Sequence, residues 1–164
     1  MKRGYSHSMM KSKTLPVIAA VTILSACAHG PSNRAIKSQC RLEMEAARTA
    51  VQMRMKGKSK QAMLQTLPPL HPDSTRLLRQ MYQFVEDAYS VSDLNEVVYG
   101  IYRLQFCVRQ LQHKPVPQQI QDVSSQLLSC QTQFGRQVSK QAIACVRATF
   151  PHQVNSQGLL LHSD

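Results

Sequence analysis

Five cysteines are the residues of this chain best suited to chemistry: Cys27, Cys40, Cys107, Cys130 and Cys145. A thiol can form a disulfide, bind a metal or act as a nucleophile, depending on its neighbours. No C-x-x-C pair and no Cys-plus-His spacing typical of zinc ligands occurs, so we expect no metal and no cofactor. Cys27 differs from the other four because it follows an apolar run near the start of the chain.

The first 27 residues have the three parts of an export signal. A basic segment without acidic residues extends to Lys13, an apolar run from Leu15 to Leu24 follows, and Ser25 and Ala26 precede Cys27. About ten apolar residues are too few for a permanent transmembrane helix, which needs roughly 20. An ordinary cleaved signal and a cytosolic chain with an apolar start are the alternatives.

The end of this run, Leu24-Ser25-Ala26-Cys27, resembles the lipobox of bacterial prolipoproteins. The resemblance implies that residues 1–26 are removed and that Cys27 becomes a lipidated N-terminus, carrying diacylglyceryl and fatty acids such as palmitate. Ala28 stands where aspartate would resemble an inner-membrane retention signal. We therefore expect a protein anchored in the lipid bilayer of the cell envelope, at the periplasmic face of the outer membrane rather than at the inner membrane.

Lipid on Cys27 would leave four cysteines, an even number, in an oxidising space. Two disulfides are then expected. Three pairings are possible, and we favour Cys40 with Cys107 and Cys130 with Cys145, the second closing a nearby helix pair. Buried free thiols are the alternative.

Beyond the signal, apolar residues recur at helical intervals, and no run alternates long enough to be a convincing strand. The stripes predict helices over residues 36–55, 60–67, 78–88, 94–111, 120–134 and 138–149. Expected starts are Ser59, Ser74 and either Ser92 or Asp93, and expected stops include Gly57 and Gly135. We predict an all-α fold, a small bundle of about five to six helices.

The domain organisation follows from these segments. Residues 27–33 form the lipidated cysteine and a short tether, residues 34–150 the helical domain, and residues 151–164 a flexible tail. Six tether residues span at most ~20 Å when extended, so the domain would lie close to the bilayer.

The chain is basic, with 20 lysines and arginines against 9 acidic residues. Four of these bases precede Cys27, which leaves 16 basic and 9 acidic residues from Cys27 onward. This balance favours anionic partners. Nucleic acid is not expected, given the compartment and the missing aromatic platform.

Arg34, Lys37, Arg41 and Arg48 recur at spacings of three, four and seven, which places them on one helix face. We interpret this face as one that contacts anionic lipid or lipopolysaccharide headgroups and orients the domain. The alternative is a solvated face that nearby Glu43 and Glu45 partly balance.

No motif predicts catalysis. The six histidines lack the spacing of a zinc protease, and no nucleophile elbow, phosphate loop or dinucleotide fingerprint occurs. The acid pairs Glu43/Glu45 and Glu86-Asp87 are interpreted as solvated helix faces. We therefore predict no catalytic residue and no enzymatic activity, with a small periplasmic enzyme kept as an alternative.

Between Gln110 and Gln141 there are ten glutamines and only four charged residues. Glutamine both donates and accepts hydrogen bonds, which suits a wet protein interface. Plain exposure to solvent explains the same composition.

Cys40, the run Met53-Arg54-Met55-Lys56-Gly57-Lys58-Ser59, Asp87-Ala88-Tyr89 and Cys107 are similar to a group of small exported proteobacterial helical proteins. That resemblance implies a fold and a compartment but no activity. A short tether and a disulfide-bridged helical bundle also resemble pilotins, which escort secretion-channel subunits to the outer membrane. By this architectural analogy we expect a non-enzymatic binding or assembly factor with an envelope protein partner. A structural lipoprotein without a dedicated client is the first alternative.

Overall fold

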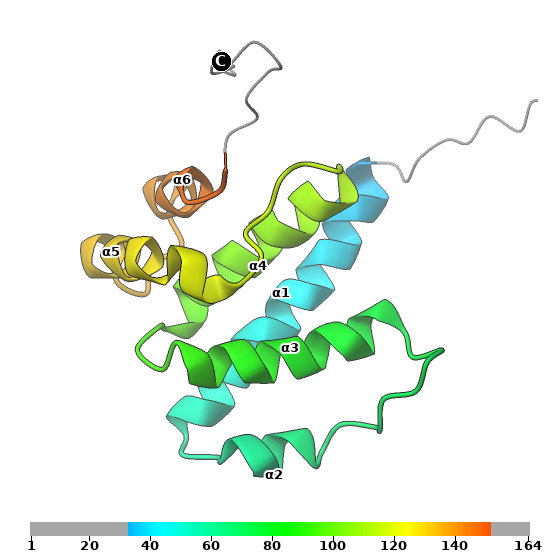
Figure 1. Cartoon of the computed structure of the whole chain (residues 1–164). Coiled ribbons are helices and arrows are strands. Elements are labelled where there is room, and N and C mark those ends of the chain that lie inside the picture. The colour runs from blue at the N-terminus through cyan, green and yellow to red at the C-terminus, as the bar shows by residue number, and fades with distance from the viewer. Residues whose placement is uncertain (1–32, 152–164) are drawn as a thin grey trace, which may run out of the picture. The chain divides into compact units, whose positions relative to one another are not determined.

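The computed structural model describes residues 33–151, and these residues form helices and no strand. Expectations that concern the signal, the lipobox, Cys27, the tether and the tail beyond Pro151 lie outside this range. The predicted all-α fold is confirmed. In chain order the helices are α1 (Asn33–Met55), α2 (Lys60–Leu64), α3 (Arg76–Ser90), α4 (Glu96–Leu111), the 3₁₀ turn η1 (Ile120–Val123), α5 (Ser124–Phe134) and α6 (Lys140–Ala148) (Figure 1).

Several helix ends follow the local signals of the sequence. Gly57 ends the first helix in a left-handed conformation with φ of 80°, which glycine adopts at little cost. Ser59 caps α2, because its side chain accepts a hydrogen bond from the backbone N–H of Ala62.

Two predicted helix starts were wrong. The cap of α3 is Thr75 rather than Ser74, whose hydroxyl instead accepts from the backbone N–H of His71 at 2.7 Å. Helix α4 begins after Asn95, not Ser92 or Asp93, and the Asn95 side chain accepts from two N–H groups of the first turn. All these residue types make good caps, so tertiary contacts selected among them.

Other helix boundaries also differ from the predicted ones. Helix α2 ends at Leu64, and residues 120–123 form a tight 3₁₀ turn before α5. Val138, predicted as the first apolar position of the sixth helix, is 67% exposed and precedes the Ser139 cap of α6.

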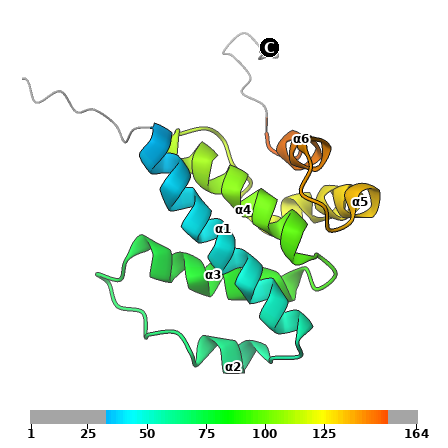
Figure 2. The same cartoon turned by 180° about the vertical axis from the view of Figure 1, so that it is seen from behind.

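Helix α1 packs against α4 and α3, while α5 and α6 lie side by side next to α4 (Figures 1 and 2). Phe84, Val98, Tyr99, Tyr102 and Leu127 are among the fully buried side chains of the core. Burying such side chains provides the main favourable free energy of folding.

Both favoured disulfides are present. Cys40–Cys107 joins α1 to α4 with a Cα–Cα distance of 5.4 Å, and Cys130–Cys145 joins α5 to α6 at 5.8 Å. One disulfide therefore links α1 to α4, and the other links the neighbouring helices α5 and α6.

Candidate functional site

Three of the four predicted surface bases are exposed at the start of α1. Arg34, Lys37 and Arg41 make no ion pair with another residue in the range 33–151. Arg48 differs, because its side chain packs over Gly100 of α4 and its guanidinium lies 3.6 Å from Glu45. A Cβ at position 100 would approach the Arg48 Cγ to 2.5 Å, so glycine makes room for this arginine. The free cationic face therefore contains Arg34, Lys37 and Arg41.

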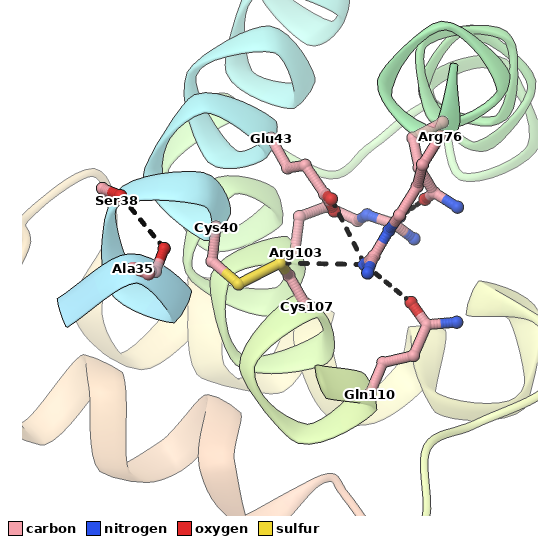
Figure 3. Close-up of a disulfide and its surroundings, with 9 residues drawn as sticks. Ala35, Ser38, Cys40, Glu43, Arg76, Arg103, Cys107 and Gln110 are labelled. Carbon is pink, nitrogen blue, oxygen red and sulfur yellow. Dashed lines mark hydrogen bonds and ion pairs between the residues drawn. A yellow bond between two sulfur atoms is a disulfide. The ribbon is translucent and has the colours of Figure 1, made fainter. Parts of the chain in front are cut away.

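A buried charge cluster lies beside the Cys40–Cys107 disulfide (Figure 3). Glu43 of α1 is only 2% exposed, and one of its oxygens lies 3.2 Å from Nη2 of Arg76 on α3. The same nitrogen donates to Oε1 of Gln110 at 2.9 Å and lies 3.9 Å from Sγ of Cys107. One arginine thus bridges α1, α3 and α4.

A second buried pair adjoins the first. Arg103 of α4 is 3% exposed, and its Nη1 lies 3.7 Å from Oδ2 of Asp87 on α3. Its guanidinium lies over the rings of Phe84 and Phe106, at 4.6 and 4.5 Å from the centroids. Such cation–π contacts partly replace the water that burial removes.

Asp87 is also held by neutral donors. The Tyr99 hydroxyl donates to its Oδ2 at 3.0 Å, and the Gln83 amide donates to its Oδ1 at 2.7 Å. The interpretation of both acid pairs as solvated faces was therefore wrong for Glu43 and Asp87, although Glu45 and Glu86 are exposed.

Burial changes the protonation equilibria of this cluster. Desolvation raises the pKa of Glu43, partly opposed by the charge of Arg76. Desolvation likewise raises the pKa of Asp87, opposed by the Gln83 hydrogen bond and by Arg103. Burial raises the pKa of the Tyr99 and Tyr102 phenols above the ordinary value, so both hydroxyls stay protonated donors.

A polar pocket of about 170 Å³ opens next to Arg103 and Asp87. Helices α3 and α4 form two of its walls, and residues 118–120 form a third. Three members of the glutamine-rich region line it: Gln110, Gln118 and Gln119. Another member, Gln131, donates to the carbonyl of Asp93 and accepts from the N–H of Asn95, which fixes the α3–α4 turn to α5.

An apolar pocket of about 150 Å³ lies between α1, α2 and α3. Met53, Met63 and Met81 come to it from the three different helices, and Phe84 forms part of its wall. Thr49, Lys58 and Thr66 provide its polar rim. Unbranched methionine side chains adapt their shape, so this lining can accept apolar groups of different outline.

No group of three His, Cys, Asp or Glu residues in positions 33–151 is arranged to hold a metal ion. Within the same range, each helix is too short or too polar to cross a bilayer.

Neither the buried charges nor the two pockets were predicted from the sequence, although the position of Glu43 indicated its burial. Glu43 lies three residues after Cys40 and four before Ala47, on the buried stripe itself. Comparisons of the chain with protein-family models, with curated proteins and with solved structures found no match to any of them.

Proposed function

We propose that this chain is a lipoprotein of the cell envelope that acts as a non-enzymatic binding or assembly factor for another envelope protein. The lipobox-like sequence ending at Cys27 supports the anchor. The two disulfides support an oxidising compartment, since such bonds rarely persist in the cytosol. All four cysteines of the described range are paired, which leaves Cys27 for the lipid.

The observation that carries the binding role is the methionine-lined pocket between α1, α2 and α3. A cavity of roughly this size in another protein admits a benzene molecule, so it suits one large apolar side chain. A partner that inserts one such side chain would bury it among Met53, Met63 and Phe84. Adaptable methionines would tolerate several side-chain shapes at that position.

The cationic face would orient the domain on the membrane. Arg34, Lys37 and Arg41 are exposed on the first turns of α1 and begin seven residues after Cys27. Each basic residue near an anionic surface contributes about 1 kcal/mol to binding. Together with the acyl anchor, they would hold α1 against anionic lipid or lipopolysaccharide headgroups.

Charge reversal should test this orientation. The variant Arg34→Glu, Lys37→Glu, Arg41→Glu of the non-lipidated domain is expected to bind anionic vesicles at least roughly tenfold more weakly, because three attractive charges become repulsive. A vesicle sedimentation assay measures this. The matched control reverses Lys114, Lys140 and Arg147, which are exposed elsewhere. Equal losses in both variants would show that net charge alone matters and would contradict an oriented face.

Crosslinking in the native host tests the binding role. The wild-type protein is expected to capture one envelope protein in stoichiometric amount, and Thr49→Arg should reduce its recovery at least roughly tenfold. Thr49 is exposed at the pocket rim, so a larger charged side chain would block entry without cutting into the core.

Thr132→Arg is the matched control for this experiment. Thr132 is also an exposed helical threonine, whose hydroxyl donates to a carbonyl four residues earlier as that of Thr49 does. Undiminished capture by Thr49→Arg would exclude the pocket. No partner for the wild type would favour a structural lipoprotein without a client.

A further inference from the structure

The proposed client-binding role does not use the polar pocket between α3 and α4. Its walls contain side chains that can make hydrogen bonds, in contrast to the apolar pocket on the other face of α3. At about 170 Å³ it is close to the size of a cavity that admits one six-membered ring.

Two arginines determine which end of two glutamine side chains remains available to a ligand. Gln80 accepts from Arg103 and Gln110 accepts from Arg76, both through the side-chain oxygen. Their amide N–H₂ groups make no hydrogen bond within the described range, so each presents two donors. Gln83 is held the other way round, because its amide nitrogen donates to Asp87 and its oxygen is left as an acceptor.

The pocket is electrically balanced. Arg103 and Asp87 are its charged lining residues, and they form a buried ion pair. A charged ligand would find no uncompensated opposite charge there and would lose its own hydration. An uncharged ligand with many hydrogen-bonding groups avoids that cost.

The remaining lining suits a ligand with an apolar surface as well as polar edges. Phe106 is half-buried, and Ile120 adds an aliphatic wall. Tyr102 also lines the pocket, and its hydroxyl makes no hydrogen bond to a residue between 33 and 151. A sugar ring combines C–H surface with hydroxyls that both donate and accept.

We propose that this pocket binds one uncharged sugar residue of a glycan. The amide N–H₂ groups of Gln80 and Gln110 would donate hydrogen bonds to oxygens of the sugar, and the side-chain oxygen of Gln83 would accept one from a sugar hydroxyl. The buried ion pairs position the glutamines and make no direct charge contact with the sugar. A glycan strand in the envelope and the oligosaccharide of a lipid headgroup both offer such residues.

Titration with defined sugars tests the proposal. The full-length protein is purified in a detergent without a sugar headgroup, and its ¹⁵N-labelled side-chain amides are followed by NMR. One probe is a tetramer of N-acetylglucosamine, which represents a glycan strand, and the other is delipidated core oligosaccharide of lipopolysaccharide. We expect at least one probe to bind saturably and to shift the Gln80 and Gln110 N–H₂ signals, and the responsive probe identifies the source.

Variants keep the test independent of folding defects. Gln83→Leu should weaken binding at least tenfold, and Gln118→Leu, which removes no hydrogen bond within the described residues, should weaken it several-fold. Gln141→Leu on α6 is the matched control and should bind as the wild type does. The proposal would be overturned if neither probe bound the wild type. It would also be overturned if Gln118→Leu and Gln83→Leu both bound the probe as tightly as the wild type does. Neither result would depend on whether the apolar pocket captures a client.

Discussion

Replacing Arg103 with methionine is expected to lower the free energy of unfolding by about 3–5 kcal/mol, because the substitution leaves the buried Asp87 carboxylate without its cation. The guanidinium contacts with Phe84 and Phe106 would also be lost. Urea unfolding followed by circular dichroism measures the change. Arg147→Met on the exposed surface of α6 is the control and should change stability by less than about 0.5 kcal/mol. A loss below about 1 kcal/mol for Arg103→Met would contradict a coupled buried pair.

The loss of stability caused by Arg103→Met should also depend on pH. Burial already raises the pKa of Asp87, and Arg103 opposes that shift, so its removal raises the pKa further. If the pKa of a carboxyl is higher in the folded state than the ordinary ~3.9 of the unfolded chain, the folded protein loses stability as the pH rises through the folded-state pKa. The variant should therefore lose more stability at pH 8 than at pH 5. Arg103→Met combined with Asp87→Asn should recover part of the loss and reduce this difference; the remainder comes from Glu43, whose pKa is raised by burial and lowered by the charge of Arg103.

Removing the Cys40–Cys107 disulfide should have an effect of similar size. The two cysteines are 67 residues apart, and the chain-entropy model gives a loss of about 4 kcal/mol when both become alanine. For Cys130 and Cys145, which are 15 residues apart, the same model gives about 3 kcal/mol. Thermal and urea unfolding of the two double variants provides the comparison. A larger loss for the Cys130/Cys145 variant would contradict the expected order.

The helices and the disulfide pairing could be predicted because they depend on local periodicity and on a small number of alternatives. Four cysteines allow three pairings, and Cys130 and Cys145 flank a short connection between two predicted helices. The start of α4 could not be predicted, since Ser92, Asp93 and Asn95 are all suitable caps. Gln131, 36 residues beyond Asn95, accepts from the Asn95 N–H and contributes to that choice.

The buried charges were accessible in principle but not recognised. Charged residues are almost never fully buried unless they are paired, so an acidic residue is assigned to solvent by default. Glu43 and Asp87 depart from this rule because Arg76 and Arg103 reach them from other helices. Those partners lie 33 and 16 residues away in the sequence, where helical periodicity carries no information about contact.

The pockets could not be predicted from the sequence at all. Each is formed where three separate segments leave space between their side chains. The methionines of the apolar pocket belong to three different helices, so no spacing within one helix brings them together. Packing of the helices, rather than any motif, decides that the three side chains meet.

Intact-mass analysis of the protein isolated from membranes of its native host tests the central claim most directly. We predict a polypeptide that begins at Cys27, carries diacylglyceryl and an N-terminal fatty acid, and has a mass lowered by the four hydrogens of two disulfides. An uncut leader, or a mature N-terminus without fatty acid, would contradict the account.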